Sequence, residues 1–87
     1  MPDQIKELED IAEVISIAIA REQSSIEFYS IAYDKAVSEA AKKIFAMFLE
    51  QENGHEANLR AQLHELRSEI AAERLKKDKT GKTQQLS

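Results

Sequence analysis

Three ionisable residues, Glu22, Glu52 and His55, stand where the helical spacing of the chain would otherwise place apolar side chains. Glu52 and His55 are three residues apart, so on a helix both project from one face and a single ion can touch both. Carboxylate and imidazole groups bind transition metals, and the absence of cysteine leaves only Asp, Glu and His as metal ligands here. These three residues are therefore the candidate metal ligands.

The apolar pattern around these residues predicts two long helices. In both halves of the chain, apolar residues recur at alternating spacings of three and four, which is one face of a helix. Asp3 and Ser38 are suitable N-caps, so we expect helices over roughly residues 3–34 and 38–77. Two glycines and one proline in 87 residues provide little turn chemistry for a sheet. The sequence predicts an all-α chain.

Asn53-Gly54 is a dipeptide that often marks a turn. The apolar register nevertheless continues across it, so we expect the second helix to be continuous there. A mid-helix glycine costs roughly 1 kcal/mol relative to alanine.

The short connection between the helices predicts an antiparallel hairpin. Glu22 and Glu52 then lie roughly 18 and 21 Å from that connection, at nearly the same level. No Lys or Arg lies on either apolar stripe to pair with them. Because an unpaired carboxylate in a dry core costs several kcal/mol, these residues require a positive partner.

A two-helix hairpin cannot enclose its apolar stripe, and chains of this size are seldom stable alone. We expect a homodimer in which two hairpins form a four-helix bundle, with further assembly left open. The dimer would pool four carboxylates and two imidazoles, the ligand set of a di-iron or di-manganese centre. The predicted domain covers residues 1–78, followed by a polar, disordered tail over residues 79–87.

The net charge of −4 is unevenly distributed. Residues 1–73 hold 15 acidic and 7 basic side chains, which argues against a nucleic-acid partner. The basic run at residues 74–79 either complements the dipole of a helix end or binds an anionic partner. No apolar stretch approaches the ~20 residues that cross a bilayer, and the N-terminus is acidic, unlike a signal peptide. We expect a cytoplasmic protein that does not bind membranes.

Two segments, residues 20–29 and 44–56, resemble the ferritin-like superfamily, most closely its rubrerythrin-type and encapsulated-ferritin branches. The similarity covers roughly residues 15–66. Its specific parts are a glutamate seven residues before a tyrosine, and Glu-x-x-His about thirty residues after that glutamate. Because the family's usual subunit has four helices, this chain resembles half of that fold.

The resemblance implies a role for each residue of the motif. Glu22 and His55 would be terminal ligands, Glu52 would bridge two irons, and Tyr29 would lie beside the centre without binding it. From the residues alone, Tyr29 is equally well explained as a core aromatic. Glu50, Glu56 and His64 are expected to face solvent.

The resemblance implies that two iron ions at each dimer interface support a ferroxidase, which oxidises Fe(II) to Fe(III). One alternative is a peroxide reductase that uses the same centre with an external electron donor. Another is a non-catalytic dimerisation or adaptor module whose acids pair with a basic partner. The encapsulated branch also implies an encapsulin nanocompartment as partner, although a tail with one Gly and one Leu does not resemble the usual docking peptide.

Overall fold

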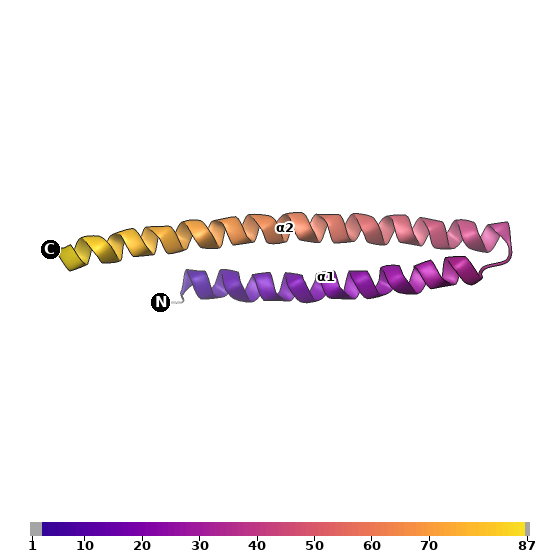
Figure 1. Ribbon diagram of the computed structural model, residues 1–87, viewed down its shortest axis with the longest axis horizontal. Helices are drawn as coiled ribbons and strands as arrows, with labels where there is room; N and C mark the ends of the chain where they lie inside the picture. Colours follow the sequence, from indigo (N-terminus) through magenta and orange to yellow (C-terminus); the bar gives the residue numbers. More distant parts are fainter. Residues whose placement is uncertain (1–2, 87) are drawn as a thin grey trace.

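Two antiparallel helices, α1 (Gln4–Lys35) and α2 (Glu39–Leu86), lie side by side in the computed structural model (Figure 1). The structure describes the backbone of residues 3–86 and the side chains of residues 3–78. The molecule is elongated, with extents of 74 × 17 × 16 Å. No strand occurs within residues 3–86, so the predicted all-α hairpin is confirmed.

Both helices begin at the predicted N-caps. The Asp3 carboxylate accepts a hydrogen bond from the backbone N–H of Ile5 at 3.0 Å. The Ser38 hydroxyl accepts one from the N–H of Ala41 at 3.1 Å. Each cap satisfies a donor that the first turn of its helix leaves free.

Residues 36–38 form the connection, and hydrogen bonds hold it closed. The N–H of Ala36 donates to the carbonyls of Ala32 and Tyr33 at 3.0 and 3.2 Å. Lys42 reaches back from α2, donating to the Tyr33 carbonyl at 3.2 Å with its ammonium 4.5 Å from the centre of the Tyr33 ring. This tight return fixes the antiparallel arrangement of the helices.

The second helix is continuous across Asn53-Gly54, as predicted. A Cβ atom built on Gly54 would meet nothing within 4 Å, so no close neighbour within the chain requires glycine.

The predicted end of the second helix, near residue 77, is wrong, because α2 continues to Leu86. Helix propagation adds one hydrogen bond for each residue fixed, and residues 78–86 contain no proline to stop it. In Figure 1, α2 extends beyond the start of α1. The side chains of residues 79–87 lie outside the described part of the chain, so the division of the domain at residue 78 stays a prediction.

The core is thin. Ile19 of α1 and Leu63 and Ile70 of α2 are the buried apolar residues among the described side chains, while large apolar residues such as Val14 and Phe28 are exposed. Two helices bury only one face of each other, which leaves apolar surface in contact with water. Within the described residues, neither helix has a stretch long and apolar enough to cross a membrane.

Candidate metal centre

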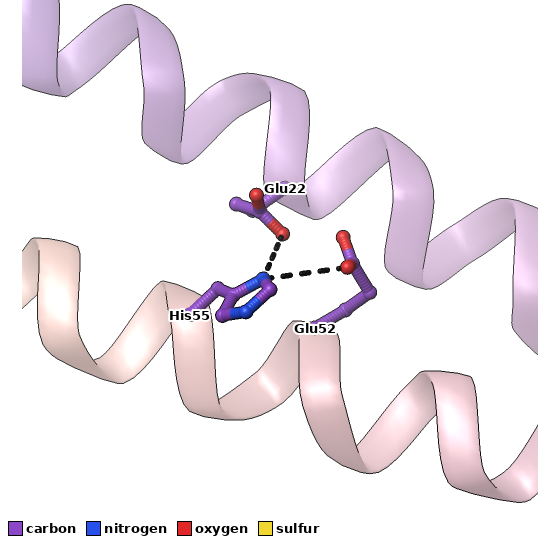
Figure 2. Close-up of side chains that lie close together, drawn as sticks. All are labelled: Glu22, Glu52 and His55. Carbon is purple, nitrogen blue, oxygen red and sulfur yellow. Dashed lines mark ion pairs between the residues drawn. The ribbon is translucent and has the colours of Figure 1, made fainter.

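Glu22 of α1 faces Glu52 and His55 of α2 across the space between the helices (Figure 2). One ligand atom from each residue lies within 4.8 Å of the other two. The Nδ1 atom of His55 is 3.4 Å from Oε1 of Glu52 and 3.8 Å from Oε2 of Glu22. The structure thus brings together the three residues that the sequence selected.

The three side chains differ in exposure. Glu22 and Glu52 are half-buried, with 23% and 19% of their side-chain surface exposed, whereas His55 is 59% exposed. The group is therefore closed on the side of the helix–helix seam and open on the side of His55.

Two like charges meet at the centre of this group. The pKa of Glu22 is raised, first because its protonated form can share a hydrogen bond with Glu52, then because of partial burial and repulsion from the Glu52 carboxylate. His55 acts in the opposite direction, and the Glu56 carboxylate raises the pKa further. In addition, Oε2 of Glu22 is buried without a hydrogen-bond partner. The two carboxylates therefore have only the His55 imidazole beside them among the converging residues, and no Lys or Arg.

The prediction that His55 lies on the core stripe and Glu56 faces solvent is wrong, because His55 is exposed and Glu56 is half-buried. Glu56 is the half-buried residue, 21% exposed, and its Oε2 pairs with Nη2 of Arg60 at 3.1 Å. One helical turn after Glu52 falls at 55.6, between the two positions, so periodicity could not distinguish them. Both residues are ionisable, so polarity could not do so either.

Tyr29 packs within a cluster of rings. Its ring centre lies 5.2 Å from that of Phe48, 5.5 Å from Phe28 and 6.5 Å from Phe45. These distances are typical of favourable aromatic contacts, so packing accounts for Tyr29. Its proposed role beside the metal stays a prediction. Glu50 and His64 are exposed, as predicted.

The donor set fits a transition metal that accepts both oxygen and nitrogen ligands, such as iron or manganese. A cation here would neutralise the Glu22–Glu52 repulsion and give the buried Oε2 of Glu22 a partner. The group also spans both helices, so binding would link α1 to α2.

Comparison with protein families matches residues 1–63 to the model of the Rubrerythrin family. The matched region contains all of α1 and the part of α2 up to Leu63, and therefore includes the three candidate ligands. Comparison with curated proteins and with solved structures returned no match.

Proposed function

The chain belongs to the rubrerythrin family of the ferritin-like superfamily, and from this premise we propose that it oxidises ferrous iron at a di-iron centre shared by two copies of the chain. Members of this family are di-iron oxidoreductases, so they share iron binding and redox chemistry. Among the candidate activities, ferroxidase chemistry requires no protein electron donor.

The observation that carries this proposal is the convergence of two carboxylates and one imidazole on one point, with a buried carboxylate oxygen that has no hydrogen-bond partner. Three donors from one chain leave most of the coordination sphere of two metal ions unfilled. A second copy would double the set to four carboxylates and two imidazoles, as in carboxylate-bridged di-metal bundles.

The open side of the site supports a second copy of the chain as the partner. Ile11 and Ile44 are both exposed. Ile11 precedes Glu22 by eleven residues and Ile44 precedes His55 by eleven, which is close to three full turns, so each isoleucine shares a helix face with its ligand. Exposed apolar residues therefore lie on these faces about 16 Å from the site in each direction along the hairpin. A two-fold dimer would bury this surface and bring the two ligand groups together.

In this proposal each chain contributes the same three ligands, Glu22, Glu52 and His55. Glu22 and Glu52 would hold ferrous iron through oxygen atoms, and these hard ligands favour the ferric product. His55 would bind through a ring nitrogen from the exposed side of the site, which the second copy would cover. Bound iron would supply the redox chemistry, in which two ferrous ions would pass one electron each to dioxygen, which with two protons gives hydrogen peroxide.

Anaerobic addition of Fe(II) followed by air, monitored by ferric charge-transfer absorption, tests this function. We expect about one iron per chain in the unchanged protein and loss of both binding and oxidation in Glu52→Ala. Glu65→Ala removes an exposed carboxylate from the same helix and should behave like the unchanged protein. Turnover with peroxide and a reductant, without oxidation in air, would instead identify a peroxide reductase. Failure to bind iron would favour the adaptor.

A further inference from the structure

Glu56 and Arg60 form an ion pair next to the metal ligands that the proposed iron oxidation does not use. Glu56 is 21% exposed and lies on the seam, while Arg60 is 55% exposed and reaches it at 3.1 Å. The pair therefore places one half-buried negative charge and one solvent-facing positive charge beside the site.

Glu56 lies on the flank of the helix–helix contact opposite to the His55 flank, where the site is open. It is the i+4 neighbour of Glu52, so the two carboxylates are adjacent on α2. It directly follows His55, and consecutive helical residues project about 100° apart. His55 is exposed on one flank of the seam and Glu56 is half-buried toward the other. A second copy that covers the His55 side would leave the Glu56 side in place.

The carboxylate of Glu56 lies close to the ligands. It is four residues, about 6 Å along α2, from Glu52 and is half-buried, although it is not among the atoms that converge on the site. Arg60 holds one of its two carboxylate oxygens and partly cancels the negative charge of Glu56. The two members of the pair thus act on the site with opposite signs.

We propose that Glu56 and Arg60 together set the electrostatic balance of the metal centre, Glu56 favouring the more highly charged ferric ion and Arg60 opposing it. This inference rests on the proposed iron oxidation. The two ligand carboxylates of each chain match the charge of one ferrous ion, and the loss of one electron to dioxygen leaves one positive charge more on the iron. Glu56 supplies part of the matching negative charge without entering the ligand set, and Arg60 limits how much of that charge acts on the iron. It is a positioning residue in this sense, because it acts through the field and not by contact.

Two charge-removing variants with opposite expected effects test the proposal. Glu56→Gln should weaken Mn(II) binding roughly five- to tenfold, the scale for one charge acting on a divalent ion across about 10 Å at the effective dielectric constant of about 20 near a protein surface, with screening at physiological salt. It should also raise the midpoint potential of the iron-loaded protein. Arg60→Gln should strengthen Mn(II) binding and lower the potential. The double variant should return close to the unchanged protein. Calorimetry with Mn(II), which needs no oxidation, and a mediated redox titration measure the two quantities.

Glu73→Gln is the matched control. Glu73 is a half-buried glutamate, 26% exposed, paired with Lys76 at 3.6 Å, but it lies about 26 Å along α2 from Glu56. At physiological salt this is several Debye lengths, so its removal should change neither quantity. Circular dichroism and the oligomeric mass show whether each variant folds and assembles like the unchanged chain.

The outcomes separate this inference from the proposed function. Shifts of the same sign in Glu56→Gln and Arg60→Gln would indicate a structural pair and overturn the inference. Equal affinities and potentials in all variants, with iron oxidation intact, would overturn it and leave the proposed function standing. An unchanged chain that binds neither Mn(II) nor Fe(II) would remove both.

Discussion

Glu9 and Glu22 of α1 both face α2, at two positions along the hairpin that we call the Glu9 level and the Glu22 level. The α2 residue that each glutamate meets differs in charge. Near the start of α1, Glu9 meets the guanidinium of Arg74. About 20 Å further along, Glu22 meets Glu52, a second carboxylate. At the first level the chain pairs opposite charges by itself. At the second it brings two carboxylates together beside His55 and leaves a buried oxygen without a hydrogen-bond partner.

The Glu9–Arg74 contact therefore stabilises the hairpin, whereas the Glu22–Glu52 contact destabilises it in the absence of a cation. The Glu9–Arg74 pair links the two helices directly, whereas the Glu22 level includes a buried polar atom, a costly feature in any fold. Natural chains tolerate such costs mainly at functional sites. The Glu22 level is therefore where an external cation should act on stability, and the Glu9 level is where it should not.

The largest expected effect is metal-dependent stabilisation. Mn(II) at a hundred times its dissociation constant should add about 2.7 kcal/mol to the free energy of unfolding, because it binds only the folded protein. Glu22→Gln should lose this gain, since the amide cannot replace a charged ligand. Thermal unfolding with and without Mn(II) measures the effect. Glu9→Gln is the control and should keep the full gain, and equal loss in both variants would erase the distinction between the two levels.

A smaller effect of opposite sign is expected without metal. Glu22→Gln should then unfold at a higher temperature than the unchanged chain, because glutamine removes the like-charge repulsion and its amide can donate to Glu52. The same substitution would therefore stabilise the metal-free protein and abolish metal binding. A metal-free Glu22→Gln protein that is less stable than the unchanged chain would show that the Glu22 level is not strained.

The pH dependence should show the same repulsion. The pKa of Glu22 in the folded protein lies above its ordinary value of 4.5. As the pH rises from 4.5 through the folded pKa, the unfolded chain loses this proton first, so the metal-free protein should lose stability relative to Glu22→Gln. With Mn(II) the trend should reverse, since the metal binds the deprotonated carboxylate. Urea unfolding of both proteins across this range isolates the contribution of Glu22, and parallel curves would contradict it.

Much of the fold followed from the sequence because its signals are local. Asp3 and Ser38 fixed the helix starts through hydrogen bonds to nearby residues. The unbroken apolar register correctly outweighed the turn signal at Asn53-Gly54. The end of α2 was missed because the apolar stripe records burial, and a helix can continue after its burial ends.

The position of the site along the helices could be predicted to within one helical turn. Matched distances from the connection placed Glu22 beside Glu52, and the structure brings them together. His55 and Glu56 lie on different sides of the contact between α1 and α2. Their positions differ by only a fraction of a helical turn, which the spacing of apolar residues does not resolve. The Glu9–Arg74 pair could not be foreseen either, because it joins residues 65 positions apart at the surface.

The smallest expected effect concerns that surface pair. Glu9 and Arg74 are 46% and 58% exposed, so their mutual coupling in a double-mutant cycle of Glu9→Gln and Arg74→Gln should not exceed about 1 kcal/mol. High salt should reduce it, because exposed charges are screened. Mn(II) affinity should be unchanged in all members of the cycle, since the pair lies about 20 Å from the ligands. A coupling well above this value would mean that the pair anchors the open end of the hairpin, and a loss of Mn(II) affinity would mean that the metal level depends on that anchor.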